Sequence, residues 1–326
     1  MAFDLNQIFS VTPSTFDNAA LQVFSYQYRH VDIYRQYCDG LKRNPDNVKE
    51  VSDIPFLPID FFKTYPVIDI SRKEVKVFES SGTTGQVTSK HRVADLQIYE
   101  HSFQKCFNQF YGDIKNYVVL ALLPSYLERD NSSLVYMAKN LIEGSGQNAS
   151  GFFLNEFEKL YDWLDVLKNG KRKVLLLGVT FALLDFAEQY KIDFPDLIVM
   201  ETGGMKGRRE ELTRQEIHMQ LRTAFDVRHI HSEYGMTELL SQGYSAGDGI
   251  FRTPDWMKVF TRDVYDPLVL QQGAATGAVN VIDLANFYSC SFIATADLAR
   301  VSADGSFEIL GRMDSAEVRG CNLMVV

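Results

Sequence analysis

The sequence lacks the features that mark several large classes of protein. Its 326 residues contain four cysteines, with no C-x-x-C pair and no clustering with histidine, so no structural zinc site is indicated. No internal repeat or long low-complexity segment occurs. The first residues lack a basic segment followed by a long apolar one, so no secretory signal is predicted. Free thiols in this setting favour a cytoplasmic protein.

Positive charge and long apolar runs are also scarce. The formal net charge of −9 argues against nucleic-acid binding, and the basic run at 171–173 is short. The longest apolar stretch, 174–187, contains Gly178, Thr180 and Asp185 and is too short to span a bilayer. We therefore expect no nucleic-acid partner and no transmembrane segment.

The apolar residues that are present, 46% of the chain, support a large core. Short apolar runs predict strands at 75–79, 117–123, 174–177 and 197–200. Helical patterns predict helices at 132–143, 155–168, 180–191 and 208–225. Alternating strands and helices predict an α/β fold with a mainly parallel sheet covered on both faces.

The two ends of the chain have sequence patterns that predict other secondary structure than the alternating strands and helices of its middle. The first fifty residues look helical, and three prolines in 51–66 predict an irregular connector. Short strands at 278–282, 292–295 and 307–310 predict a small β subdomain. We expect one domain over 1–326, subdivided into a helical segment, an α/β core, and a β subdomain with a tail, at 1–66, 67–250 and 251–326.

A helix is also predicted after residue 95, with an aromatic stripe that includes Tyr99, Phe103 and Phe107. Such a stripe is usually core, and the wall of an apolar pocket is the alternative. His101 lies off the stripe, where an exposed histidine is expected and entry into a site is the alternative.

The most informative segment is the run Ser80-Ser81-Gly82-Thr83-Thr84-Gly85. Glycines let backbone N–H groups turn toward an anion, and hydroxyls add neutral donors. The run follows the predicted strand 75–79 and precedes a helical pattern, which is the strand–loop–helix order of phosphate sites. A plain turn or a flexible linker is the alternative.

This run is neither a Walker A sequence nor G-x-G-x-x-G. It resembles the phosphate loop of the adenylate-forming superfamily, whose members join a carboxylic acid to AMP from ATP. The segment Tyr234-Gly235-Met236-Thr237-Glu238 fits the superfamily's Tyr-Gly-x-Thr-Glu motif. An aromatic face can stack on adenine, a hydroxyl can bind the α-phosphate, and a carboxylate can hold Mg²⁺. A helix start with a buried tyrosine is the alternative.

Two later segments continue the resemblance. Residues 295–300 are similar to the Thr-Gly-Asp block, which implies that Asp297 grips the ribose hydroxyls. Residues 311–320 are similar to the Gly-Arg-x-Asp hinge block, which implies that Arg312 faces ribose or phosphate and that Asp314 sits at the hinge. Each could be a surface turn, but all the blocks occur in the superfamily's order.

The resemblance narrows to one branch. Residues 122–129, 178–185 and 201–208 look like the LuxE-type acyl-protein synthetases. These enzymes activate a long-chain fatty acid with ATP and pass the acyl group, through an enzyme thiol, to a partner reductase.

The sequence also departs from the wider superfamily. Many members carry Pro-Lys directly after the loop, whereas here Lys90 comes later and its contact with phosphate is an open question. Full-length members continue into a small mobile domain that supplies a catalytic lysine. This sequence ends at Val326, so we expect that domain to be absent, as in LuxE-type enzymes.

The resemblance implies an ATP- and Mg²⁺-dependent acid–thiol ligase acting on a long- or medium-chain fatty acid. The phosphate-loop residues would wrap pyrophosphate, and Thr84 would also assist catalysis. Thr237 and Glu238 would hold the α-phosphate and Mg²⁺. Residues implied to bracket adenine are Gly203, Gly204, Tyr234 and Gly235. An acyl- or aryl-CoA ligase (or carrier ligase) and a non-catalytic scaffold for a reductase are the alternatives.

Cys321, close to the end of the sequence, is the predicted acyl acceptor. LuxE-type enzymes carry a cysteine near the C-terminus on a mobile tail, and Gly320 would give this tail freedom while Arg319 favours the thiolate. A buried, inert cysteine is the alternative. Cys38, Cys106 and Cys290 are weaker candidates because they fall in or beside predicted helices and strands.

Overall fold

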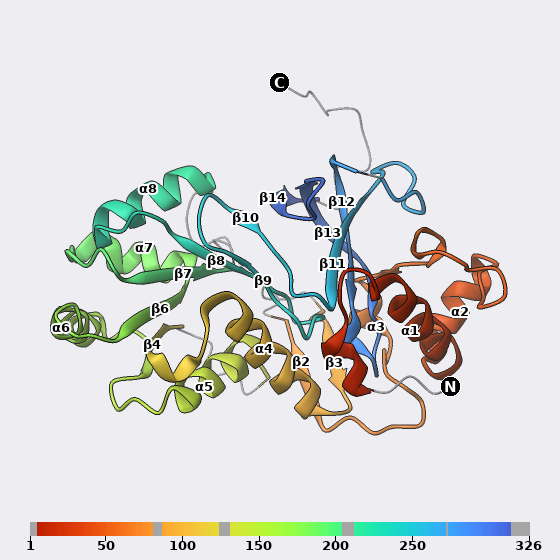
Figure 1. Cartoon of the computed structure of the whole chain (residues 1–326), viewed down its shortest axis with the longest axis horizontal. Coiled ribbons are helices and arrows are strands. Elements are labelled where there is room, and N and C mark those ends of the chain that lie inside the picture. Colours follow the sequence, from red (N-terminus) through yellow and green to blue (C-terminus); the bar gives the residue numbers. More distant parts are fainter. Residues whose placement is uncertain (1–4, 81–86, 124–130, 204–211, 272, 314–326) are drawn as a thin grey trace. The chain divides into compact units, whose positions relative to one another are not determined.

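The computed structural model describes residues 5–80, 87–123, 131–203, 212–271 and 273–313 (Figure 1). The chain divides into two compact units. The first combines Met1–Lys73 with Asp255–Val326, and the second is Glu74–Pro254. The helical N-terminal segment and the C-terminal β segment, treated above as separate subdivisions, therefore lie within one unit.

The second unit is built on a mainly parallel sheet with the strand order β5-β4-β6-β7-β8-β9. The first five of these strands pair in parallel, and β9 pairs antiparallel with β8. In chain order the parallel strands read 2-1-3-4-5, which is a doubly wound arrangement. The strands are β4 (Tyr117–Leu122), β5 (Gly151–Phe153), β6 (Lys173–Val179), β7 (Ile198–Thr202), β8 (His231–Tyr234) and β9 (Gly243–Ser245).

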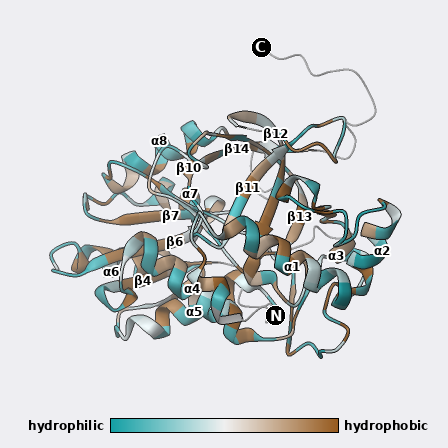
Figure 2. Ribbon diagram, turned by 45° about the vertical axis from the view of Figure 1, so that its right-hand side comes forward, coloured by the Kyte–Doolittle hydropathy of each residue, from teal (hydrophilic) through white to brown (hydrophobic). Residues whose placement is uncertain are grey.

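The central strands form because their sequences are continuous apolar runs. Every residue of β4, and every residue of β6 after Lys173, is buried. Parallel strands covered on both faces have this composition, whereas a half-exposed strand would alternate. These strands are drawn in brown in Figure 2. The strands predicted at 117–123, 174–177 and 197–200 are thereby confirmed, while β5, β8 and β9 were not predicted.

Helices connect the parallel strands and cover both faces of the sheet (Figure 1). The connection from β4 to β5 runs toward one edge of the sheet, and the connections to β6, β7 and β8 run toward the other. Because such crossovers are right-handed, α5 lies on one face of the sheet and α6, α7 and α8 lie on the other. Ring contacts agree, because α4 packs on α5 through Tyr99 and Tyr136, and α6 packs on α7 through Phe157 and Phe186. The helices are α4 (Leu96–Tyr111), α5 (Ser133–Ser145), α6 (Phe157–Leu167), α7 (Thr180–Gln189) and α8 (Arg214–Phe225).

Local sequence fixes where several of these helices begin and end. Asp95 accepts a hydrogen bond from the backbone N–H of Gln97 and caps α4. Thr213 and Glu216 form a reciprocal capping box at the start of α8. Gly146 ends α5 in the left-handed conformation, with φ of 61°. The helices predicted at 132–143, 155–168 and 180–191 are confirmed. The helix predicted at 208–225 begins only at Arg214, and residues 208–211 lie outside the described residues.

The first unit holds an antiparallel sheet with the order β14-β13-β12-β11. The short strand β1 pairs in parallel with β13 through Leu57 and Ile293. The connector expected to be irregular at 51–66 thus contains a strand of this sheet. The elements are β1 (Leu57–Pro58), β11 (Met257–Arg262), β12 (Ala275–Asp283), β13 (Phe292–Val301) and β14 (Phe307–Arg312).

The N-terminal helices belong to this unit because one buried amide ties them to the β segment. Gln27 is fully buried, and its side-chain nitrogen donates to the carbonyls of Asn286 and Phe287 at 3.0 Å. Its side-chain oxygen accepts from the backbone N–H of Ser291, also at 3.0 Å. The helices are α1 (Phe16–His30), α2 (Asp32–Gly40) and α3 (Phe61–Thr64), with short 3₁₀ turns at Leu5–Ser10, Val51–Asp53, Ile114–Asn116 and Leu284–Asn286.

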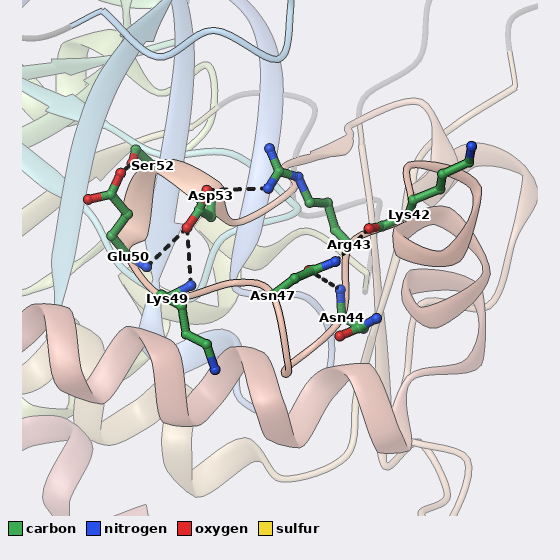
Figure 3. Close-up of polar contacts among 8 residues, drawn as sticks. All are labelled: Lys42, Arg43, Asn44, Asn47, Lys49, Glu50, Ser52 and Asp53. Atoms are coloured by element: carbon green, nitrogen blue, oxygen red, sulfur yellow. Dashed lines mark hydrogen bonds and ion pairs between the residues drawn. The ribbon is translucent and has the colours of Figure 1, made fainter.

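The loop after α2 is held by its own polar side chains (Figure 3). The Asp53 carboxylate accepts backbone N–H bonds from Lys49 and Glu50 at 3.1 and 3.3 Å, and Arg43 approaches it to 3.3 Å. The bond from Lys49, ahead of the others, lowers the pKa of Asp53 despite its partial burial. Because these bonds satisfy the loop locally, it serves as a connector rather than a binding loop.

Candidate functional site

Four of the distinctive sequence blocks meet at one edge of the parallel sheet. The blocks that begin at residues 122, 178, 201 and 234 start at the carboxyl ends of β4, β6, β7 and β8. These strands are neighbours in the sheet, so the blocks are neighbours as well. In open α/β sheets, ligands bind beyond the carboxyl ends of the strands. The topology therefore defines a candidate ligand-binding edge in the second unit.

The predicted phosphate loop lies between two antiparallel strands, β2 (Lys76–Glu79) and β3 (Lys90–Val93). The strand predicted at 75–79 is confirmed, but the expected strand–loop–helix order is wrong. The segment after the loop extends and pairs with β2, and α4 begins only at Leu96. No helix N-terminus directly follows the loop, so a helix dipole is not part of its design.

Two hydrogen bonds between Ser80 and Ser89 close the base of this loop. The Ser80 backbone N–H donates to the Ser89 carbonyl at 3.0 Å, and the Ser89 N–H donates to Ser80 Oγ at 2.9 Å. Ser80 is thus placed at the mouth of the loop. The other predicted loop residues, Ser81, Gly82, Thr83, Thr84 and Gly85, lie outside the described residues.

Lys90 is exposed at the start of β3. Its Nζ lies 3.6 Å from Glu79 Oε1 on the paired strand, and the two side chains are 47% and 36% exposed. Such a pair is weak and easily exchanged, so it is compatible with a contact from Lys90 to phosphate. That contact stays a prediction.

His91, which the sequence did not single out, joins the two principal motifs. It is fully buried on β3, and its Nδ1–H donates to the Thr237 carbonyl at 2.9 Å. Burial lowers the pKa of His91 to about 4, although the bond to Thr237 opposes that shift. The neutral ring therefore fixes the backbone of the predicted Thr237-Glu238 pair against the hairpin that carries the phosphate loop.

Residues 235–240 form a turn after β8, so the alternative of a helix start is wrong. Thr237 is half-buried and Glu238 is only 5% exposed. Among the described residues, no group of three or more histidine, cysteine or carboxylate side chains forms a metal cage. One carboxylate suits Mg²⁺ that arrives bound mainly to nucleotide phosphates, as is usual for this ion.

The residues predicted to bracket adenine lie on two adjacent strand ends. Thr202 of β7 pairs with Glu233 of β8, so Gly203 and Tyr234 each follow the last paired position. Tyr234 is 9% exposed and packs at a steep angle on Phe251 of the short strand β10 (Ile250–Phe251), with ring centroids 6.0 Å apart. Gly204 lies outside the described residues.

The position of Gly203 is fixed by buried polar side chains of neighbouring elements. The Thr180 hydroxyl, at the start of α7, contacts Glu201 Oε2 at 2.8 Å and also reaches the Gly203 carbonyl. Burial would raise the pKa of Glu201, but the nearby side chains of His218, Ser232 and Thr180 outweigh it and lower the pKa. His218 Nε2 of α8 lies 3.7 Å from Glu201 Oε1. Glu201 is thus held as a carboxylate, and the end of β7 is tied to two helices.

Asp297 and Arg312, the predicted ribose residues, are cross-strand partners in the first unit. Asp297 is half-buried on β13, and its backbone N–H donates to Thr295 Oγ1 at 3.1 Å. Arg312 is exposed at the end of β14. The sheet register therefore presents a carboxylate and a guanidinium side by side. Asp314 lies outside the described residues.

The guanidinium group of Arg262 is buried near Asp297. This residue was not identified from the sequence. Arg262 donates to the Thr295 carbonyl at 2.7 Å and to Asn280 Oδ1 at 2.8 Å. Desolvation lowers the pKa of Arg262, while Tyr37 and Asp297 oppose that shift. It joins β11, β12 and β13 at the place where β12 carries a register shift.

The three described cysteines, Cys38, Cys106 and Cys290, are all buried. Burial raises the pKa of Cys38 to about 12 and raises the pKa of Cys290 well above its usual range. Thiols held protonated in this way are poor nucleophiles. Cys321 lies outside the described residues.

The predicted helix stripe and His101 behave as expected. Tyr99, Phe103 and Phe107 of α4 are core residues, and His101 is exposed. No described helix combines the length and apolar character needed to cross a membrane.

Solved structures share this fold. ATP-bound MatB from Rhodopseudomonas palustris aligns with a TM-score of 0.56 at 14% identity, over 76% of this chain and 49% of that chain. A 2-hydroxyisobutyryl-CoA ligase in complex with 2-HIB-AMP and CoA aligns with a TM-score of 0.62 at 13% identity, over 91% of this chain and 74% of that chain. This chain thus spans about half the length of the MatB chain. The fold is the α/β fold of the adenylate-forming superfamily.

Sequence comparison defines the branch. The family "Acyl-protein synthetase, LuxE" matches residues 11–326, so the chain belongs to this family of ligases. The long-chain-fatty-acid–luciferin-component ligase of Vibrio harveyi is 24% identical over 92% of this chain and 84% of that protein. The protein of the same name from Photorhabdus luminescens is 38% identical over 66 residues, which are 20% of this chain and 56% of that relative.

Proposed function

We propose that this protein activates a carboxylic acid, a long- or medium-chain fatty acid, with ATP and Mg²⁺ to form an acyl-adenylate. The observation that carries the proposal is the bond from His91 to Thr237, which joins the hairpin of the phosphate loop to the Tyr-Gly-Met-Thr-Glu segment. Membership of the LuxE family supports the reaction type.

In the proposed first step, a carboxylate oxygen of the fatty acid attacks the α-phosphorus of ATP and pyrophosphate leaves. Thr237 and Glu238 would hold the α-phosphate and its Mg²⁺, and the hydroxyls and backbone N–H groups of the phosphate loop would take the pyrophosphate. The protein would contribute mainly in-line placement and stabilisation of developing charge. Asp297 and Arg312 would fix the ribose.

In the proposed second step, the Cys321 thiolate attacks the acyl carbonyl carbon. A carbon–sulfur bond forms, the bond from the acyl carbon to the AMP oxygen breaks, and AMP leaves. The acyl group then passes to an acyl-reductase partner. The burial of Cys38, Cys106 and Cys290 supports this choice of acceptor, because a buried protonated thiol reacts slowly.

The first test is ATP–pyrophosphate exchange across a panel of acids from acetate through aryl acids to tetradecanoate. We expect exchange that rises with chain length up to a cutoff, because each buried CH₂ contributes about 0.8 kcal/mol. Best activity with a small aryl acid, together with a coenzyme A requirement for product release, would identify an acyl- or aryl-CoA ligase instead. Failure to bind ATP would identify a non-catalytic scaffold.

The second test concerns the thiol. Cys321→Ser should keep pyrophosphate exchange and lose hydroxylamine-sensitive labelling by radioactive fatty acid plus ATP. Cys106→Ser, which changes a buried cysteine, should keep both. Label that persists in Cys321→Ser would place the acceptor on another residue.

A further inference from the structure

Glu233 is a buried carboxyl group that the proposed roles leave unused. It immediately precedes Tyr234 and Gly235, and it is only 8% exposed. Its strand position pairs with Thr202 at the carboxyl end of β7, so it lies within the candidate ligand-binding edge. A buried carboxyl group costs free energy unless it has partners, so its contacts bear directly on function.

Each oxygen of this carboxyl group has a defined neighbour. The Thr202 hydroxyl donates to Oε2. On the other side, a Cβ atom built on Gly235 would lie 2.3 Å from Oε1, which is far closer than real contacts allow. The carboxyl group therefore occupies the space that a side chain at position 235 would need. A side chain at position 235 would therefore have to displace the Glu233 carboxyl group from its bond with Thr202.

A second buried polar group faces the same point. The Cγ atom of Gln242 lies 3.7 Å from the same built Cβ on Gly235. Gln242 is 3% exposed, and among the described residues its Oε1 has no hydrogen-bond partner. Buried acceptors are usually satisfied, so this oxygen calls for a donor. We take a protonated Glu233 carboxyl group as the candidate donor, because both side chains pack against Gly235.

The surroundings of Glu233 favour the protonated form of its carboxyl group. Burial raises the pKa of Glu233 to about 7; the Thr202 hydrogen bond opposes this, and the nearby Glu201 carboxylate adds to it. Tyr99 of α4 and Tyr244 of β9 are the other titratable groups that face it. Among the residues that the structure describes, no cation lies within ion-pair distance of Glu233.

We propose that Glu233 is a positioning residue for ATP binding. Its neutral carboxyl group packs against Gly235 and fixes the conformation of the turn that carries Tyr234 and Thr237. This inference rests on the proposed function, because it assigns a role within the same nucleotide site. An ionised Glu233 would place an uncompensated negative charge behind a segment that receives a polyphosphate. It would also remove the proton that can satisfy Gln242.

The test measures KM for ATP and kcat of pyrophosphate exchange across the pH range around 7. We expect the wild-type KM for ATP to stay flat below about pH 7 and to rise by up to about tenfold per unit above it. Glu233→Gln keeps the shape and stays neutral, so its KM should remain low and lose this inflection. Glu201→Gln removes the neighbouring carboxylate that helps to raise the pKa of Glu233, so the inflection should persist but move to lower pH.

Other outcomes overturn the proposal. An unchanged inflection in Glu233→Gln would assign it to another group. Loss of ATP binding by Glu233→Gln at every pH would mean that the negative charge itself is needed. A rise confined to kcat would place the titrating group in the chemical step rather than in nucleotide positioning.

An independent readout separates this inference from the proposed function. Infrared spectra of the ligand-free protein below pH 7 should contain a protonated-carboxyl band that disappears in Glu233→Gln and persists in Glu201→Gln. Absence of that band overturns the neutral-acid assignment even if exchange is normal. Absence of exchange with every acid, with the band present and ATP bound, would instead defeat the proposed reaction.

Discussion

The nucleotide-binding residues proposed in the two units are held in different ways. In the second unit, buried side chains fix the backbone, as when His91 donates to Thr237 and Thr180 contacts Glu201. In the first unit, strand register places Asp297 of the inner strand β13 opposite Arg312 of β14, where Asp297 is half-buried and Arg312 is exposed. Changes that break these buried contacts of the second unit should therefore reduce stability, whereas changes at Asp297 and Arg312 should affect activity alone.

The largest effect on activity is expected at Glu238. Glu238→Gln nearly preserves the shape of a buried side chain but removes the charge proposed to hold Mg²⁺. We expect exchange to fall by about 10²- to 10³-fold, with the thermal midpoint little changed. The control is Glu158→Gln on the exposed surface of α6, which should have wild-type exchange. A near-normal rate for Glu238→Gln would remove this residue from the mechanism.

The next effect is on stability and concerns His91. Its folded-state pKa is depressed from 6.5 to about 4, so the folded state binds fewer protons than the unfolded state between these values. Stability is fully present above about pH 6.5 and is lost as the pH falls toward 4. The expected loss is about 3 kcal/mol in free energy of unfolding.

His91→Gln should flatten this acid-side loss, measured by urea unfolding at several pH values. His101→Gln, at an exposed position on α4, is the matched control and should keep it. An unchanged pH profile in His91→Gln would assign the acid sensitivity to a different group.

A smaller effect, on activity alone, is expected in the first unit. Asp297→Asn keeps the strand and its backbone bond to Thr295 but weakens the grip on ribose hydroxyls. We expect KM for ATP to rise about 10- to 100-fold, with unfolding unchanged. With 2′-deoxy-ATP the penalty should shrink. A large drop in stability would contradict the expectation that this carboxylate acts in binding and not in folding.

The smallest effect is expected at the exposed ion pair of Lys90 and Glu79. Glu79→Gln should change the free energy of unfolding by less than about 1 kcal/mol, because exposed pairs contribute little. Lys90→Ala should match it in stability. If Lys90→Ala alone also weakens ATP binding, and does so less at high salt, the predicted phosphate contact is supported.

Sequence patterns predicted the elements whose burial is uniform. The apolar runs of β4 and β6 and the capped helix α8 can be read from periodicity and end signals. The short strands β1 and β5 were not predicted, because two or three residues are too few to show an alternating pattern. The strand after the phosphate loop was also not predicted, because its four residues include Lys90, His91 and Arg92, which do not look like a strand.

The site shows the same division. Motif residues such as Tyr234 could be named from the sequence because the motif itself identifies them. The residues that hold them could not, since His91 and Glu233 gain their meaning from partners far away in the sequence or from burial.

The paired bonds between Ser80 and Ser89 have a consequence for changes within the loop. They close the hairpin below the loop, so β2 and β3 keep their register whatever lies between these two serines. Lengthening a closed loop costs little, about 0.6 kcal/mol for each doubling. Changes within the loop should therefore alter phosphate binding while the hairpin and the core around it keep their structure.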